Sequence, residues 1–389
     1  MWLILFLLVP GPSQSLPIAA SHASQTLPII SSWYQSKKII PPRPDPDLMD
    51  VALLNSRALM ELPKVSSQDS MAFLKFHLMR KQIGDANLYP FALRLSRHLS
   101  PDNNLRSFLD KNATQNSFTH YGWGIVRTPK ETIMTFIFVR RRLEITQLTH
   151  LKARSLKVCG RLLSGSNPQL FLTTPDHQII RRNLSMRQSR FCTETPLKTS
   201  GKYQLEIMVE GPSGPEVAFL LPIYSKISPP PIPSHKVYPD QELLDEHRTA
   251  ELLFALINQS RRQMHLKPVL LLPALTVVAQ RHSREMMERG TFGHRSLQYG
   301  DLSKRLSHLS NRFTIAEEAL ALASSPWSAH DSLLDSPSHR ATLLSPALTH
   351  VGIGVATDKS QQLLYITECF IQEVKPESGS DEMDQPVFD

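Results

Sequence analysis

The stretch Thr349-His350-Val351-Gly352-Ile353-Gly354-Val355-Ala356 decides the fold of the C-terminal third of the chain. Together with the apolar residues 363–371, it predicts two strands joined by a turn. Apolar residues recur at helical spacing in the earlier segment 252–261, so we expect a helix there. Pro273 fits the first turn of a second helix, which Gly290 can end. Helices that flank a hairpin sheet predict a layered α-β-α arrangement.

Several short motifs follow one another through this part of the chain. They are Leu256-Ile257-Asn258-Gln259-Ser260-Arg261, Leu275 with Ala279 and His282, Phe292-Gly293-His294, Ser336-Pro337-Ser338-His339-Arg340, and His350-Val351-Gly352-Ile353-Gly354-Val355. In this order they resemble the bacterial SCP-like type of CAP domain, a family named for cysteine-rich secretory proteins, antigen 5 and plant pathogenesis-related proteins. The resemblance covers the C-terminal third and says nothing direct about the residues before it.

The resemblance implies a cleft that gathers two histidines and one or two glutamates. In some members of the family the histidines hold a divalent metal such as zinc. By motif position the histidines are His294 and His339, and the glutamate is Glu318. Two neutral imidazoles suit Zn²⁺, and a nearby carboxylate can bind the metal, orient a ring or act as a base on bound water. The resemblance therefore suggests His294 and His339 as metal ligands and Glu318 as the catalytic group.

The acidic motif departs from the family pattern. Glu317 stands where the family has glycine, and Ala319 stands where it has asparagine. No residue matches the second glutamate of animal and plant members, although Asp331 and Asp335 lie near its place. Glu317 either supplies the missing acid or is simply solvated. The cleft histidines also have a structural alternative, in which they bond backbone groups at turns.

The rest of the chain predicts a multi-domain α+β protein, because single hydrophobic cores stop growing at roughly 250 to 300 residues and this chain has 389. We expect an N-terminal helical region, a central β-sandwich and a C-terminal α-β-α layered CAP domain. The predicted boundaries are a signal peptide at 1–23, a linker at 24–47, the helical region at 48–112, the β-sandwich at 118–227, a Pro-rich linker at 228–240, the CAP domain at 241–373 and an acidic disordered tail at 374–389.

Three patterns support these boundaries. Apolar residues at helical spacing after residue 48 indicate packed helices. Tyr203-Gln204-Leu205-Glu206-Ile207 alternates as a strand does, and a turn leading into tyrosine is typical of Ig-like sandwiches. The consecutive prolines Pro229-Pro230-Pro231 favour an extended, semi-rigid spacer.

The N-terminal run Met1-Trp2-Leu3-Ile4-Leu5-Phe6-Leu7-Leu8-Val9 has the length of a signal peptide and is too short for a transmembrane helix. We therefore expect export to the periplasm or extracellular space, with no transmembrane anchor after signal removal. A buried N-terminal helix is the alternative. An oxidising compartment allows one disulfide, and Cys159 and Cys192 are the natural pair because they share one predicted β region. Cys369 is then a buried free thiol.

The formal net charge of +8 is compatible with nucleic acid, anionic lipid or acidic wall polymers as partners. The longest basic run, Arg140-Arg141-Arg142, has no aromatic stacking pattern beside it, so a solvated surface is favoured and nucleic-acid binding is the weakest hypothesis. The leading hypothesis is a non-catalytic exported binding or scaffold protein that contacts an envelope component, a lipid, a glycan or another protein. The alternative is a metal-dependent envelope hydrolase that uses the His/His/Glu cleft.

Overall fold

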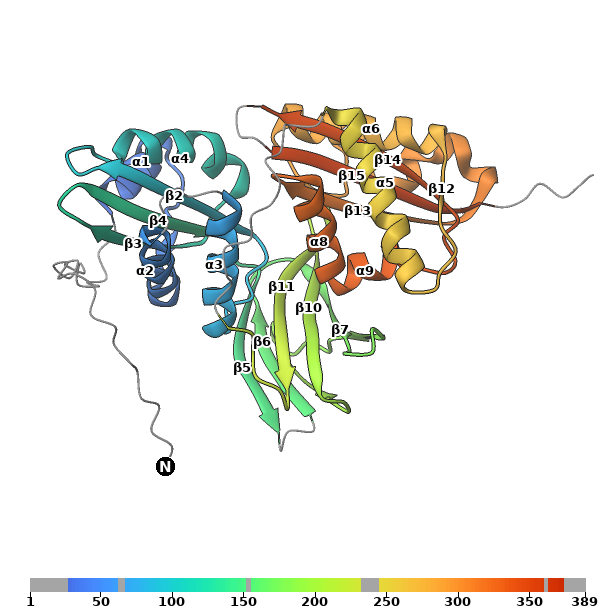
Figure 1. Ribbon diagram of the computed structural model, residues 1–389, viewed down its shortest axis with the longest axis horizontal. Coiled ribbons are helices and arrows are strands. Elements are labelled where there is room, and N and C mark those ends of the chain that lie inside the picture. The colour runs from blue at the N-terminus through green and yellow to red at the C-terminus, as the bar shows by residue number, and fades with distance from the viewer. Residues whose placement is uncertain (1–26, 62–66, 152–154, 232–244, 360–362, 374–389) are drawn as a thin grey trace, which may run out of the picture. The chain divides into compact units, whose positions relative to one another are not determined.

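The computed structural model describes residues 27–61, 67–151, 155–231, 245–359 and 363–373 (Figure 1). These residues divide into two compact units, one formed by residues up to Lys81 with Leu88–Val139, the other by Gln82–Asn87 with residues from Arg140 onward. Helices and four sheets make it a mixed α and β protein over the described ranges. The predicted signal peptide and the predicted acidic tail lie outside the described residues.

The first unit is built on one four-stranded sheet of order β1-β3-β4-β2. Its elements are α1 (Pro28–Lys37), β1 (Arg43–Pro44), α2 (Pro46–Met60), α3 (Ser67–Arg80), β2 (Leu88–Ser96), α4 (Asp102–Asn116), β3 (His120–Arg127) and β4 (Glu131–Val139). The Asp45 side chain caps α2 by accepting bonds from two backbone N–H groups of its first turn. Gly122 and Gly124 let α2 lie directly on β3, since a Cβ on either would fall within 2.3 Å of the helix backbone.

Three of the predicted segment boundaries do not match the elements of this unit. The segment predicted as a linker at 24–47 contains α1, which buries Trp33 and Tyr34 in an aromatic cluster with residues of α4 and the sheet. The region predicted as helical at 48–112 also contains strand β2. The β-sandwich predicted from residue 118 begins later, because β3 and β4 pair with β1 and β2. The sequence of a short apolar strand does not predict which sheet the strand joins, because pairing with other strands depends on the tertiary fold.

The second unit begins with a β module, defined here as residues 143–225. Its strands are β5 (Leu143–Leu151), β6 (Ser155–Leu162), β7 (Ser166–Thr173), β8 (Ile179–Asn183), β9 (Arg190–Pro196), β10 (Gly201–Gly211) and β11 (Gly214–Ser225). They form a sheet of order β11-β10-β7-β8 and a sheet of order β5-β6-β9, which share one hydrophobic cluster. The buried Tyr203 hydroxyl donates to the carbonyl of Thr199 and accepts from its N–H, both at 3.0 Å. These two bonds tie the start of β10 to the turn that precedes it.

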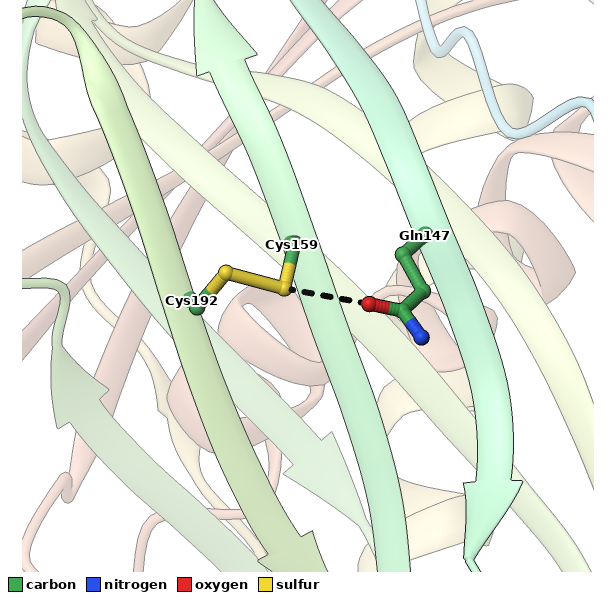
Figure 2. Close-up of a disulfide and its surroundings, with 3 residues drawn as sticks. All are labelled: Gln147, Cys159 and Cys192. Carbon is green, nitrogen blue, oxygen red and sulfur yellow. Dashed lines mark hydrogen bonds between the residues drawn. A yellow bond between two sulfur atoms is a disulfide. The ribbon is translucent and has the colours of Figure 1, made fainter.

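A disulfide joins neighbouring strands of the smaller sheet. Cys159 on β6 and Cys192 on β9 are direct register partners, and their Cα atoms are 4.1 Å apart. Figure 2 shows the bridge lying across the two strands, with Gln147 of β5 beside the Cys159 sulfur. The predicted pairing is confirmed, and so is the prediction that Cys369 is buried and free.

The basic run at the start of the second unit is not a solvated surface, and that prediction is wrong. Arg141 makes a two-pronged ion pair with the buried Asp85, at 2.8 Å between its Nη2 and the carboxylate. Arg140 and Arg142 both pair with Glu216 of β11, at 2.9 and 2.8 Å. The three guanidinium groups therefore link the segment that leads into the β module to residues 82–87 and to β11. Because their charges are paired in these contacts, little positive charge is left for an external polyanion.

The C-terminal module, residues 245–373, carries a sheet of order β12-β14-β15-β13. Its elements are α5 (Glu246–Gln263), β12 (Leu270–Leu271), α6 (Pro273–Arg289), α7 (Leu302–Arg305), the 3₁₀ helix η1 (Ser307–Arg312), β13 (Phe313–Ala323), α8 (Pro326–Asp335), α9 (Pro337–Leu343), β14 (His350–Asp358) and β15 (Leu363–Glu373). The two predicted strands are β14 and β15, which pair antiparallel. Pro273 opens α6, and Gly290 ends it with φ of 61° in the left-handed region.

Two glycines of β14 set the packing of this module. A Cβ on Gly352 or Gly354 would fall 2.2 Å from the backbone of α6, so only glycine lets the helix lie this close. The alternate residues of β14 join a hydrophobic cluster with α5 and α8. The buried Arg261 of α5 donates to the carbonyls of Lys267, Leu343, Ser345 and Leu348, which ties the connecting loops to the helix. No helix within the described ranges is long and apolar enough to cross a bilayer.

Candidate functional site

His294, Glu318 and Arg305 form a hydrogen-bonded group beside the sheet. His294 lies in the loop that follows α6, Glu318 is on β13, and Arg305 ends the short helix α7. The His294 Nδ1 is 2.9 Å from Glu318 Oε1, so the structure brings these two predicted residues together. Arg305 Nη2 donates to the same oxygen at 2.9 Å, and its Nη1 lies 2.7 Å from Glu318 Oε2.

The Glu318 carboxylate is charged and fully engaged in this arrangement. Its side chain is 2% exposed and that of Arg305 is 3% exposed, so the ion pair is shielded from water. Burial alone would raise the pKa of Glu318, but hydrogen bonds from His294 and Arg305 outweigh burial and lower the pKa to about 2. An ionised carboxylate only accepts hydrogen bonds, so His294 Nδ1 is the donor in this contact.

His339 is oriented by a different group. Its Nδ1 is 2.7 Å from the hydroxyl oxygen of Ser336, and this hydroxyl also makes a short hydrogen bond to the Glu206 carboxylate of the β module. Burial raises the pKa of Glu206, and hydrogen bonds from Ser336 and Ser338 oppose this rise. When Glu206 is ionised, Ser336 donates to the carboxylate and accepts from His339 Nδ1, which leaves Nε2 as the acceptor of this ring. Burial, together with the nearby charge of His294, lowers the pKa of His339 to about 3. The imidazole is therefore neutral at physiological pH.

The donor set was predicted to suit zinc, and the geometry fits this only in part. Both rings are held through Nδ1 by hydrogen bonds, which is how metal-ligating histidines are oriented. Both Glu318 oxygens already contact Arg305 or His294, so a metal would have to compete with these partners for the carboxylate. Over the described ranges, no group of three histidine, cysteine, aspartate or glutamate side chains is placed to hold a metal ion. A zinc ion here would need ligands from outside this set, since protein sites supply three or four.

Neither Glu317 nor Asp335 fills the place of the missing second glutamate beside Glu318. Glu317 precedes Glu318 on the same strand, and strand alternation turns its side chain to the opposite face of β13. Asp335 lies 3.6 Å from Lys202 Nζ, on the β module. The second carboxylate near the histidines is Glu206 instead, and it comes from a strand outside the C-terminal module.

Sequence reasoning missed Arg305, Ser336 and Glu206 as parts of this site. Arg305 carried no motif signal, although a buried glutamate generally needs a cation. Ser336 was named only as part of the His339 motif, whereas its hydroxyl bridges an imidazole and a carboxylate. Glu206 lies between Leu205 and Ile207 in a strand where polar and apolar residues alternate, so its sequence neighbours do not distinguish it from a solvent-exposed residue.

Two further histidines of the module are structural. His282 is buried on the α6 stripe where the sequence placed it, and its Nε2 donates to the carbonyl of Gly293 at 3.0 Å. That bond fixes the loop which carries His294. His330 on α8 lies 2.8 Å from the Ser260 hydroxyl, and burial lowers its pKa to about 4.

Comparison with known proteins gives one family. Residues 254–372 match the model of the cysteine-rich secretory protein family, CAP. A curated relative, the uncharacterized protein YkwD of Bacillus subtilis (strain 168), is 28% identical over 100 residues, which are 25% of this chain and 39% of YkwD. The chain thus spans about two fifths of the length of that relative.

Among solved structures, an extracellular protein with an SCP domain from Bacillus anthracis is 18% identical, with 60% of this chain and 86% of that chain covered at a TM-score of 0.31. A cysteine-rich secretory protein from Staphylococcus aureus is 13% identical, with 77% and 92% covered at a TM-score of 0.27. An outer surface protein from Borrelia burgdorferi is 19% identical, with 34% and 97% covered at a TM-score of 0.32. The family match, together with the motif series, identifies residues 254–372 as a CAP domain of the bacterial type.

Proposed function

We propose that this is an exported binding protein that holds an envelope ligand at the His294/His339 cleft and does not transform it. The observation that carries the proposal is the saturated carboxylate of Glu318, which Arg305 neutralises and His294 occupies. A general base must accept a proton near neutral pH, and a carboxyl group with a pKa of about 2 is a poor acceptor. In this proposal Glu318 orients His294 and takes no part in proton transfer.

The two imidazole rings determine which hydrogen-bonding groups a ligand must carry. His339 is neutral and can present Nε2 as a hydrogen-bond acceptor, while Glu318 holds His294 through Nδ1, so a ligand rich in hydroxyl or amide donors fits the pair. Envelope glycans carry such donors, and they are the ligand class we propose; lipids and proteins are the alternatives. The layered CAP domain and a β-sandwich formed by the two sheets of the β module provide the rigid frame for such a cleft.

The test of binding uses insoluble peptidoglycan as the probe, incubated with the full chain and separated by centrifugation. The wild type should sediment with the glycan, and the double variant His294→Ala, His339→Ala should remain mostly in solution. His265→Ala serves as the matched control, because this histidine is exposed at the end of α5. Equal sedimentation of the wild type and the double variant would rule out glycan binding at this cleft.

The second candidate is a metal-dependent hydrolase, and one observation favours it: both Nδ1–H groups are fixed, as in metal-ligating histidines. Zinc titration by calorimetry separates the candidates. Zinc binding that the double variant loses and His265→Ala keeps would support a metal site. Equal binding by all three proteins, or binding by none, would remove this candidate.

Export is a separate part of the proposal. The apolar N-terminal run supports it, and so does the disulfide, because such bridges persist in oxidising compartments. Fractionation of cells that express the native gene, followed by N-terminal sequencing, checks it. Full-length protein that keeps Met1 and stays in the cytoplasm would contradict export.

A further inference from the structure

The hairpin formed by β10 and β11 reaches both segments that carry the cleft histidines. At its turn, the carbonyl of Ser213 accepts a hydrogen bond from Arg295 N–H at 2.9 Å. A Cβ on Gly214 would lie 3.1 Å from the Cβ of His294, and a Cβ on Gly293 would lie 2.5 Å from that of Ser213. The turn therefore rests directly on the His294 loop.

Further along β10, the same hairpin meets the His339 segment. The fully buried Glu206 accepts from the Ser338 backbone N–H with Oε1 at 3.0 Å and from the Ser336 hydroxyl with Oε2. The Ser336 hydroxyl oxygen in turn lies 2.7 Å from His339 Nδ1. Glu206 and Ser336 are separated by 130 residues in the sequence, so this carboxylate arrives only through the packing of the two modules.

Two contacts at the edge hold the same interface. Lys202 Nζ lies 3.6 Å from Asp335 at the end of α8, and Arg340 of α9 donates to His177 Nδ1 at 3.2 Å. Helix α9 contacts both β10 and β7, which Figure 1 shows below it. The β module is thus packed against the part of the CAP domain where His339 lies.

We propose that the β10–β11 hairpin is a wall of the CAP cleft and that Glu206 is the positioning residue for His339, in place of the second glutamate that the CAP domain lacks. Each ring then has its own carboxylate, since Glu318 holds His294 directly and Glu206 holds His339 through Ser336. The cleft is complete only when both modules are present. The proposal rests on the proposed function only in treating the histidine pair as the ligand site.

The substitution Glu206→Gln tests this because it reverses one hydrogen bond. The amide oxygen replaces Oε1 as the acceptor from Ser338, which turns the amide NH₂ toward Ser336. Ser336 then accepts from the amide and donates its own hydrogen to His339 Nδ1. The ring changes from the Nδ1–H tautomer to the Nε2–H tautomer and loses its acceptor in the cleft.

The measurement is ¹⁵N NMR of the full chain labelled at histidine, with the His339 signal assigned from a His339→Ala variant. The wild type should show Nδ1 protonated, Glu206→Gln should show Nε2 protonated, and Ser336→Ala should also lose the Nδ1–H form. Glu210→Gln is the matched control, because it makes the same charge change at an exposed position of β10. The His294 signal, fixed by Glu318, reports that the variants are folded.

A wild-type His339 in the Nε2–H form, or a tautomer that Glu206→Gln leaves unchanged, would overturn the assignment. The same variants are then tested for sedimentation with insoluble peptidoglycan, where Glu206→Gln should weaken binding about tenfold, in line with the effect of removing partners that orient site histidines. A tautomer change without any change in binding supports the role of Glu206 and contradicts the proposed glycan site. The positioning role of Glu206 and the proposed glycan site can therefore be refuted independently of each other.

Discussion

Glu368 on β15 offers a sharp test of the electrostatics of the CAP domain. Its register partners are Ala319 and Ile353, and its side chain is fully buried. Neither carboxyl oxygen has a hydrogen-bond partner among the described residues. Burial raises the pKa of Glu368 to about 8 from its ordinary value of 4.5, because a charge without a partner is disfavoured in an apolar interior.

The sign of the effect follows from the two pKa values. Between pH 4.5 and 8 the folded protein holds the Glu368 proton and the unfolded chain releases it. The stabilising contribution is therefore complete below pH 4.5 and is lost as pH rises toward 8. Linkage gives a slope of about 1.4 kcal/mol per pH unit, or about 3 kcal/mol between pH 5 and 7.4.

The substitution Glu368→Gln removes this titration and keeps the side-chain shape. Relative to wild type, its free energy of unfolding should increase by about 3 kcal/mol from pH 5 to pH 7.4. The comparison must be between the two proteins, because His330 and His339 have lowered pKa values and contribute the opposite slope below pH 6.5. That shared slope cancels in the difference.

The assay is urea unfolding followed by the fluorescence of Trp327 on α8, with the three other tryptophans of the chain changed to phenylalanine. Glu317→Gln on β13 is the matched control for the change of charge, at a side chain that is only half-buried. Its stability difference from wild type should stay flat over the same pH range. Parallel pH curves for wild type and Glu368→Gln would refute the reasoning, because they would mean that Glu368 finds a partner or reaches water.

Changing both Cys159 and Cys192 to serine should destabilise the β module by about 3 to 4 kcal/mol, because the bridge closes a loop with a sequence separation of 33. Urea unfolding with and without reductant checks this, and a variant as stable as the oxidised wild type would contradict it. Arg305→Met should cost about 3 to 5 kcal/mol by leaving the Glu318 charge buried without the guanidinium that neutralises it. Because the pKa of Glu318 is lowered to about 2, its stabilising contribution is present above pH 4.5 and is lost as pH falls toward 2, so this variant should unfold at a higher pH in an acid titration followed by fluorescence. Gly354→Ala should cost about 1 to 3 kcal/mol, since its Cβ would push α6 off the sheet, and an unchanged melting temperature would show that the helix can shift freely.

The sequence predicted best where the signal is local. The strand pair at 349–371 and the caps of α6 depend on alternation, a first-turn proline and a left-handed glycine, and each acts within a few residues. The disulfide pair was predictable because only three cysteines exist and two share a β region. His294 and Glu318 were found through the order of motifs, which also reflects local chain geometry.

The boundary between the first unit and the β module could not be found in this way. Strands β3 and β4 have the same short apolar character as the strands of the β module, yet they pair with β1 and β2. Pairing depends on which surfaces meet, and alternation within one strand carries no information about the partner. The arginine run shows the same limit of sequence-based prediction. Its charges were predicted to be solvated, because the sequence does not show that Glu216 and Asp85 lie beside them in the fold.

The amino-acid sequence by itself determined the CAP domain, its helix ends, its central hairpin and two members of the group around Glu318. Only the tertiary structure decided which charges and donors surround that group. Arg305 fixes the charge of Glu318, and Glu206 reaches Ser336 across 130 residues of sequence. The reason is physical: backbone periodicity is set by neighbours along the chain, whereas the pKa and tautomer of a buried group are set by charges and donors that folding brings within hydrogen-bond distance.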